Sequence, residues 1–257
     1  MAVMSAVLLT WLAAGVAPAA AGLPEAIERV KPSIVAVGTF QRTRNPPFAF
    51  RGTGFVVGDG TLVVTNAHVL PDALQADQKE TLVVLAAGAA SADARGAQAR
   101  DVKLVAVDKE HDVALLRLSG APLPALKIGD SGAVREGLSV AFTGFPLGYA
   151  LGFVPVTHRG IVAALTPIVL PAPGSPHLDE AAIRRLRAGA FVVFQLDATA
   201  YPGNSGSPVY DPETGQVIGV INMVFIKSTK ESMLREPSGI SFAVPARHLQ
   251  ELLREAK

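Results

Sequence analysis

The sequence is built from short runs of Val, Ile, Leu and Phe that Gly, Pro, Asp and Asn repeatedly interrupt. Short apolar runs bounded by turn-forming residues are typical of β-strands. Twelve such runs are predicted as strands: 33–40, 52–57, 61–65, 81–85, 102–107, 113–118, 139–143, 154–165, 191–196, 208–210, 217–225 and 240–244. A Gly- and Pro-rich passage at 119–132 separates the first six from the last six. Because a closed barrel leaves no open sheet edge, we expect an all-β fold with two six-stranded antiparallel β-barrels.

Three segments outside the strands have a helical pattern. A short helix is expected at 24–30, and an arginine-bearing helix with its arginines in solvent is expected at 178–188. The C-terminal helix is predicted at 245–256, because Pro245 suits a first helical position and leucines recur on one face after it. The first barrel is then expected at about 30–120 and the second at about 133–245.

The N-terminal segment 1–22 has no charged side chain, is rich in Ala, Val and Leu, and ends in small residues. These are features of a secretory signal, with cleavage predicted after Ala19 or Ala21 and the folded domain at 23–257. A retained membrane anchor is the alternative interpretation. Either interpretation predicts a periplasmic or secreted protein, and no later segment is long and apolar enough for a membrane helix.

The composition excludes several kinds of chemistry. There is no cysteine, so disulfides, thiolate metal sites and cysteine nucleophiles are absent. The formal net charge is only +1, from 23 Lys and Arg against 22 Asp and Glu, which gives no electrostatic footprint for a nucleic acid. No metal-ligand cluster or cofactor motif is visible. We therefore predict no metal, no cofactor and no nucleic-acid partner.

The segment 201–209 places Ser205 between two glycines, with prolines on either side. Glycines at 203 and 206 can adopt backbone angles that are closed to other residues, so peptide N–H groups can point at one spot in front of the hydroxyl. Such a spot can hold an oxyanion. The alternative is an ordinary turn between strands, since Gly, Asn, Ser and Pro dominate turns.

Two further residues favour the first interpretation. His68 follows an apolar strand, where it could accept a proton from a hydroxyl, and Asp112 begins a strongly apolar strand. A partly buried carboxylate needs a partner, and an imidazole N–H can supply one. We predict Ser205 as nucleophile, His68 as base and Asp112 as the group that orients it. The predicted oxyanion hole comprises Gly203, Asn204 and Ser205, with the N–H groups of Gly203 and Ser205 as donors.

Each of these residues also has an ordinary structural interpretation. A lone histidine such as His68 is most often satisfied or exposed, and Asp112 alone would most often be a turn or capping residue. The remaining histidines are given no role; they are His111, which should point away from its neighbour Asp112, and His158, His177 and His248. Coincidence becomes improbable once all three motifs occur in one order at the ends of predicted strands.

With these motifs in view, the chain resembles the chymotrypsin-fold serine proteases, and most of all the bacterial HtrA/Deg-like branch. The matching segments are 52–57 (GTGFVV), 65–69 (TNAHV), 111–116 (HDVALL), 160–162 (GIV), 195–198 (QLDA), 202–206 (PGNSG), 217–222 (VIGVIN) and 239–245 (GISFAVP). The resemblance runs from about Pro32 to the C-terminus. It implies a chymotrypsin-like double barrel and a serine endopeptidase that cleaves polypeptides through an acyl-enzyme on Ser205, in extracytoplasmic quality control or processing.

Departures from the family pattern concern activation and specificity. Ser207 stands where HtrA-like enzymes usually have glycine, although glutamyl endopeptidases of this fold share the Ser-Pro pair. Asn204 replaces the aspartate that captures a new N-terminus in trypsin-like zymogens. Activation through that salt bridge is therefore not expected. The resemblance places a specificity pocket at Thr199, Ala200, Tyr201, Ile221, Asn222, Met223 and Ser241. Thr199 stands where trypsin has aspartate, and Asn222 where glutamate-selective relatives have histidine. We therefore expect cleavage after small or medium aliphatic residues.

HtrA-like enzymes usually carry a PDZ domain after the protease and often form trimers. This sequence ends at Lys257, so we expect regulation through its own loops, its N-terminus or a regulatory protein partner, and a homotrimer by resemblance. The insertion at 166–190 is the candidate regulatory element. Two alternatives stay open: a protease-fold, chaperone-like or peptide-binding protein with little or no cleavage, and, more weakly, an esterase with the same chemistry.

Overall fold

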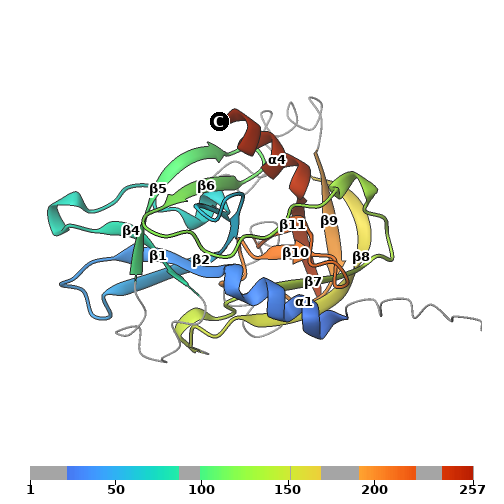
Figure 1. The fold of residues 1–257 in the computed structure, drawn as a ribbon, viewed down its shortest axis with the longest axis horizontal. Helices are drawn as coiled ribbons and strands as arrows, with labels where there is room; N and C mark the ends of the chain where they lie inside the picture. The colour runs from blue at the N-terminus through green and yellow to red at the C-terminus, as the bar shows by residue number, and fades with distance from the viewer. Residues whose placement is uncertain (1–21, 87–98, 151, 169–190, 224–238, 257) are drawn as a thin grey trace, which may run out of the picture.

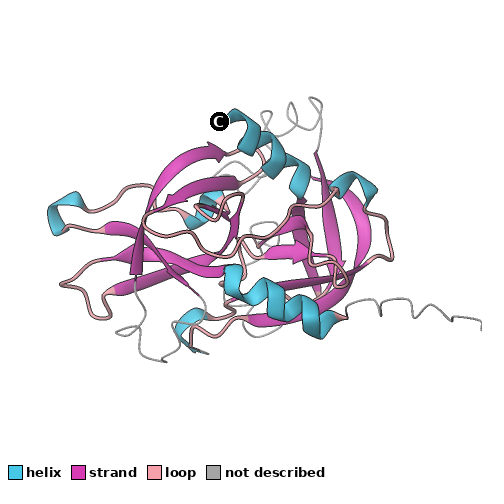
Figure 2. Ribbon diagram, in the orientation of Figure 1, coloured by secondary structure: helices cyan, strands magenta, loops and turns pink. Residues whose placement is uncertain are grey.

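A computed structural model describes residues 22–86, 99–150, 152–168, 191–223 and 239–256. The chain forms two closed antiparallel barrels of six strands each, followed by a C-terminal helix (Figures 1 and 2). The predicted all-β, chymotrypsin-like fold class is confirmed. The N-terminal segment 1–21, the expected helix at 178–188 and most of the insertion at 166–190 lie outside the described residues.

The first barrel contains the strands β1 to β6 in the order β1-β2-β3-β6-β5-β4. Their bounds are β1 Ile34–Phe40, β2 Phe48–Val57, β3 Leu62–Thr65, β4 Thr81–Ala86, β5 Ala99–Asp108 and β6 Val113–Leu118. Strand β2 begins four residues earlier than predicted, because Phe48 to Phe50 keep pairing with the end of β1 beyond an irregularity at Val37 and Gly38. The turn after β2 is closed by the Asp59 carboxylate, which accepts from the Thr61 N–H at 3.0 Å.

The second barrel contains the strands β7 to β12 in the order β10-β11-β12-β9-β8-β7. Their bounds are β7 Ser139–Gly144, β8 Val156–Ile168, β9 Phe191–Asp197, β10 Pro208–Tyr210, β11 Val217–Asn222 and β12 Ile240–Pro245. Short 3-10 turns connect elements of both barrels; they are η1 Lys31–Ser33, η2 Ala67–Val69, η3 Ala76–Gln78, η4 Ser131–Ala133 and η5 Gly148–Ala150. The barrels therefore repeat one strand order at two places in the chain.

The linker between the barrels is hydrogen-bonded to both of them. The Leu126 N–H donates to the Val56 carbonyl at the end of β2, at 2.8 Å. Three residues further on, the Gly129 N–H donates to the Val217 carbonyl at the start of β11, also at 2.8 Å. Because one short segment pairs with a strand of each barrel, it fixes how the two barrels meet.

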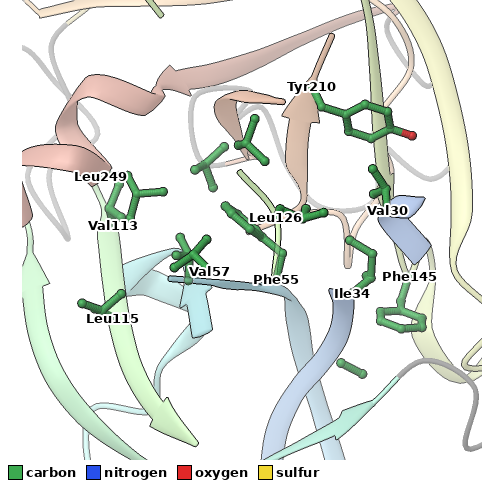
Figure 3. Packing of buried hydrophobic residues seen from close by; sticks show 14 of the residues in the cluster. Val30, Ile34, Phe55, Val57, Val113, Leu115, Leu126, Phe145, Tyr210 and Leu249 are labelled. Atoms are coloured by element: carbon green, nitrogen blue, oxygen red, sulfur yellow. The ribbon is translucent and has the colours of Figure 1, made fainter. Parts of the chain in front are cut away.

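A shared hydrophobic core joins the barrels and two helices. The helices are α1 (Leu23–Val30) and α4 (Ala246–Glu255). Figure 3 shows part of this core, with contributions from α1, both barrels, the linker and α4; its fully buried members include Val30, Ile34, Phe55, Val113, Tyr210 and Leu249. Burying one such side chain contributes about 1.5–3 kcal/mol. Among the described residues no helix has the length and apolar character needed to cross a membrane.

Candidate active site

Three of the predicted site residues are linked by hydrogen bonds at the junction of the barrels. The His68 Nε2 lies 2.9 Å from the Ser205 Oγ, and its Nδ1 lies 2.5 Å from the Asp112 Oδ2. Asp112 is 7% exposed, as is Ser205, whereas about a third of the His68 side chain is accessible. An imidazole held between a hydroxyl and a buried carboxylate can accept the hydroxyl proton while the carboxylate stabilises the resulting imidazolium.

His68 is positioned by the turn that follows β3. It lies in the 3-10 turn η2, and its backbone N–H donates to the Asp112 Oδ1 at 2.9 Å. Asp112 therefore binds the backbone and the ring of the same histidine. On the other side of His68, the Arg51 guanidinium on β2 donates from Nε to the Val69 carbonyl at 2.5 Å and from Nη2 to the Leu70 carbonyl at 3.1 Å. The histidine turn is thus attached to β2 and to the residue that precedes β6.

Asp112 adopts the left-handed backbone conformation, with φ of 56°. Aspartate tolerates this region better than most residues, and its carbonyl is held there by two donors, the Asn66 Nδ2 at 2.9 Å and the Ala67 N–H at 3.2 Å. The buried carboxylate also accepts from the Asn222 Nδ2 at 2.7 Å. Together with the two bonds from His68, this contact compensates the carboxylate for lost water.

The peptide before Gly203 is fixed by the segment that follows β7. The Leu147 N–H donates to the Pro202 carbonyl at 2.7 Å, and in a trans peptide the Gly203 N–H then points the opposite way. Gly203 has φ of 101°, and a Cβ at this position would lie 2.4 Å from the Phe145 carbonyl oxygen and 2.9 Å from the Phe50 ring. Only glycine meets both requirements.

The peptide before Ser205 is fixed within its own turn. The Ser207 N–H donates to the Asn204 carbonyl at 2.9 Å, which directs the Ser205 N–H to the other side. Within the described part of the chain, the N–H groups of Gly203 and Ser205 donate to no protein acceptor. The Asn204 N–H, in contrast, donates to the Tyr201 carbonyl at 2.9 Å. The two N–H groups predicted as donors are thus free of protein acceptors in the described residues, whereas the N–H of Asn204, the third residue of the predicted oxyanion hole, is engaged in the turn.

Ser207 is accommodated by a glycine on the neighbouring strand. Its side chain is fully buried and faces Gly144 on β7, where a Cβ would lie only 2.0 Å from the Ser207 Oγ. The Ser207 backbone is engaged with β11, since its carbonyl accepts from the Ile221 N–H at 2.9 Å. The buried serine is therefore accommodated without breaking the pairing that follows Ser205.

The predicted pocket residues come from three neighbouring segments around strands β9, β12 and β11. Thr199, Tyr201 and Met223 are partly exposed, whereas Ala200, Ile221, Asn222 and Ser241 are buried. Ser241 donates from Oγ to the Ala198 carbonyl at 2.9 Å. The assignment of the Asn222 side chain to the pocket needs correction, because its amide binds Asp112 instead. The family resemblance identifies the segment around Asn222 as part of the site, but it does not say in which direction the Asn222 side chain points.

Three residues hold the site together in roles that sequence reasoning did not assign: Asn66 and Thr53 were not named as site residues, and Asn222 was named only as a pocket residue. Asn66 and Asn222 bind Asp112, and Thr53 binds the Gly203 carbonyl through its hydroxyl at 2.7 Å. All three lie in segments that were matched to the protease family, and two of them are buried amides, which require partners. The need of a buried amide for a hydrogen-bond partner was the signal that the sequence offered, although it does not identify that partner.

His111 lies beside Asp112 but belongs to a separate cluster. Its Nδ1 is 2.6 Å from the Asp108 Oδ2, and its ring stacks on that of His248 in α4 at 3.6 Å between centroids. Phe191 packs edge-on against both rings. His111 therefore contacts the C-terminal helix rather than the Ser205 hydroxyl. No group of three or more His, Asp and Glu side chains in the described ranges could hold a metal ion.

Comparison with known proteins agrees with this geometry. The model of the trypsin-like peptidase domain matches residues 52–220. The chain is 32% identical over 239 residues to a probable periplasmic serine endoprotease, DegP-like, of Pseudomonas putida, and 28% identical over 242 residues to the serine protease HTRA1A of Danio rerio. Each alignment covers 91% of this chain but 41% of the relative, so the chain spans about two fifths of the length of these curated relatives. The chain belongs to the trypsin-like serine peptidase family and is similar to DegP-like and HtrA proteases.

Proposed function

We propose that the protein is a serine endopeptidase that hydrolyses polypeptides through an acyl-enzyme on Ser205. The observation that carries this proposal is the unbroken series of hydrogen bonds from Asp112 through His68 to the Ser205 Oγ. An isolated serine hydroxyl is a poor nucleophile, and an adjacent neutral imidazole removes its proton as attack proceeds. The names of the relatives, which are serine proteases and endoproteases, support the same activity.

The reaction follows from the positions of these atoms. The Ser205 Oγ forms a bond to the scissile carbonyl carbon while its proton moves to the His68 Nε2, 2.9 Å away. Asp112 accepts from Nδ1 and stabilises the imidazolium. His68 then gives the proton to the departing amine, the C–N bond breaks, and a water attacks the acyl-enzyme with the same base. Ser205 is regenerated when the carboxylic acid leaves.

The oxyanion of the tetrahedral intermediate is assigned to the N–H groups of Gly203 and Ser205. Both point away from carbonyls that are already bonded, Pro202 to Leu147 and Asn204 to Ser207. Donors fixed before the reaction cost no reorganisation when the charge develops, and one such donor contributes about 3–4 kcal/mol to transition-state stabilisation. This geometry supports a loop already shaped for catalysis.

We assign substrate selection to the partly exposed residues Thr199, Tyr201 and Met223. None of them carries a formal charge, so a strongly cationic or anionic side chain before the scissile bond would find no opposite charge there. The expected preference is for small or medium aliphatic residues. Digestion of a peptide library, with the cleaved sites read by mass spectrometry, tests it. Cleavage mainly after Arg, Lys or Glu would contradict the assignment.

We place the activity outside the cytoplasm, in protein quality control or processing. The support is the uncharged, apolar segment 1–22 together with the periplasmic location in the printed name of the Pseudomonas relative. Fusion of residues 1–22 to alkaline phosphatase, which is active only after export, tests this location. A fusion that remains inactive while it is stably produced would contradict it.

Labelling with a fluorophosphonate tests the nucleophile. The full chain should be labelled, Ser205→Ala should not, and Ser207→Ala, which removes the neighbouring serine hydroxyl, should be labelled like the parent protein. Cleavage of an unfolded polypeptide such as casein should follow the same pattern. A folded parent protein that is not labelled, yet binds the unfolded chain, would establish the chaperone-like alternative. Labelling of Ser205→Ala would assign the nucleophile elsewhere.

A further inference from the structure

We propose that Thr53 is the positioning residue that keeps the oxyanion donors of the second barrel aimed from the first barrel. This inference rests on the proposed peptidase function. Thr53 lies in β2 and is wholly buried. It touches none of the reacting atoms, but it contacts the Ser205 loop through its side chain and its backbone.

The Thr53 hydroxyl bridges two segments of the second barrel. It donates to the Gly203 carbonyl at 2.7 Å and accepts from the Phe145 N–H at 3.0 Å. Its only proton and one lone pair are thereby used. Phe145 begins the turn from which Leu147 holds the Pro202 carbonyl. One hydroxyl therefore ties the peptide after Gly203 to the turn that fixes the peptide before it.

The Thr53 backbone holds the other end of the same loop. Its N–H donates to the Ser205 carbonyl at 2.9 Å, and its carbonyl accepts from the Thr65 Oγ1 at 2.7 Å. A Cβ on Gly206 would lie 2.0 Å from that carbonyl oxygen, so the backbone of Gly206 lies in close contact with that of Thr53. The peptides after Gly203 and after Ser205 are both bound to this single residue.

Contacts of this kind matter because Gly203 has little conformational preference of its own. A glycine can rotate its flanking peptides at small steric cost, so the neighbours must set the direction of its N–H. Without the Thr53 hydroxyl, the Gly203 carbonyl and the Phe145 N–H would lose a buried partner. Because an unpaired buried polar group is costly, both groups would be favoured to rotate toward other hydrogen-bond partners. The Gly203 N–H would turn with them, and the oxyanion would lose part of its stabilisation while substrate binding is retained.

The test compares Thr53→Val, which keeps the shape but removes the hydroxyl, with Thr53→Ser, which restores it. Thr39→Val is the matched control, because Thr39 is also a buried first-barrel threonine whose hydroxyl makes a side-chain hydrogen bond, to Glu80 at 2.6 Å. Each full-length variant is assayed for kcat and KM on a peptide substrate. Inhibition by a peptide aldehyde, which forms a tetrahedral adduct with the nucleophilic serine, and the thermal midpoint are measured in parallel.

Thr53→Val should lower kcat by about tenfold to a hundredfold, less than the ~10²–10³ seen when a donor itself is removed. The inhibition constant of the aldehyde should rise by a similar factor and KM should stay within about twofold. Thr53→Ser should recover most of the activity, and Thr39→Val should lose stability without losing kcat.

Parent-like kcat and aldehyde inhibition in Thr53→Val would overturn the proposal. So would an equal loss of kcat in Thr39→Val at the same thermal midpoint, since Thr53 would then act only through stability. If Thr53→Val does not fold, Thr53→Ala takes its place, and failure of both to fold would also overturn it. A parent protein that is neither labelled at Ser205 nor active contradicts the proposed function instead.

Discussion

The stacked histidines between α4 and the first barrel predict a loss of stability as the pH falls. His248 is 7% exposed and its ring lies on that of His111. Its Nε2 accepts from the Arg247 Nε at 3.2 Å, and its Nδ1 lies 3.2 Å from the Glu251 carboxylate. Because Nε2 is an acceptor, this arrangement requires neutral His248. A proton added there would face Arg247 and the neighbouring ring.

Burial, followed by the charges of His111 and Arg247, lowers the pKa of His248 from 6.5 to about 4, although Glu251 acts in the opposite direction. The unfolded chain therefore binds this proton first. The stability that neutral His248 provides is fully present above about pH 6.5 and is lost as the pH falls toward 4. At 1.36 kcal/mol per pKa unit the loss is at most about 3.4 kcal/mol, and it is smaller once solvent screens the charge of the exposed Arg247.

Urea unfolding of the parent protein, His248→Gln and His111→Gln between pH 7.5 and pH 4.5 measures this loss. The difference between the parent protein and His248→Gln isolates His248 from the carboxylates that titrate in both proteins. The curve of His111→Gln also contains a change at Asp108, whose carboxylate loses its hydrogen-bonded imidazole. His248→Gln should show a flatter dependence of unfolding free energy on pH. His111→Gln should be intermediate, since removal of one cation raises the pKa of His248. Parallel curves for the parent protein and His248→Gln would refute the reasoning.

Three further changes have specific expected results. Gly203→Ala should lower kcat about 10²–10³-fold while the protein still folds, because the added Cβ would lie 2.4 Å from the Phe145 carbonyl oxygen and displace the N–H donor. Unchanged steady-state kinetics would exclude the Gly203 N–H as an oxyanion donor. Asn222→Leu should reduce kcat/KM about tenfold, because it removes the hydrogen bond to the Asp112 carboxylate and a bond of this type contributes about 1.5–3 kcal/mol. An unchanged kcat/KM would contradict this role of Asn222. Leu249→Ala should lower the unfolding free energy by about 2–5 kcal/mol in a urea titration, since Leu249 is fully buried, and a loss below about 1 kcal/mol would refute that packing.

Local sequence pattern was sufficient for the strands and for the order of His68, Asp112 and Ser205. Each depends on residues close in sequence: an apolar run, a turn former, or a polar residue at the end of a strand. The left-handed backbone of Asp112 is different, since its carbonyl is held by groups that lie 45 and 46 residues earlier in the chain, Ala67 and Asn66.

The supporting hydrogen bonds depend on how the two barrels meet, which no local pattern encodes. Asn222 reaches Asp112 across 110 residues of sequence, and Thr53 reaches Gly203 across 150. These contacts follow from barrel packing, so a sequence predicts that buried amides need partners without predicting which partners they find.

The distribution of the site over both barrels makes activity a late event in the folding of the chain. Thr53, His68 and Asp112 precede the linker, whereas Gly203 and Ser205 come after the further strands β7, β8 and β9 have been made. Contacts between residues so distant in sequence form slowly, since long loops must close first. A nascent chain, or one whose barrels have folded but not yet docked, holds the base and the nucleophile apart. On the proposed function, each partly folded form would therefore be a dormant protease, unable to digest itself or its neighbours before folding is complete.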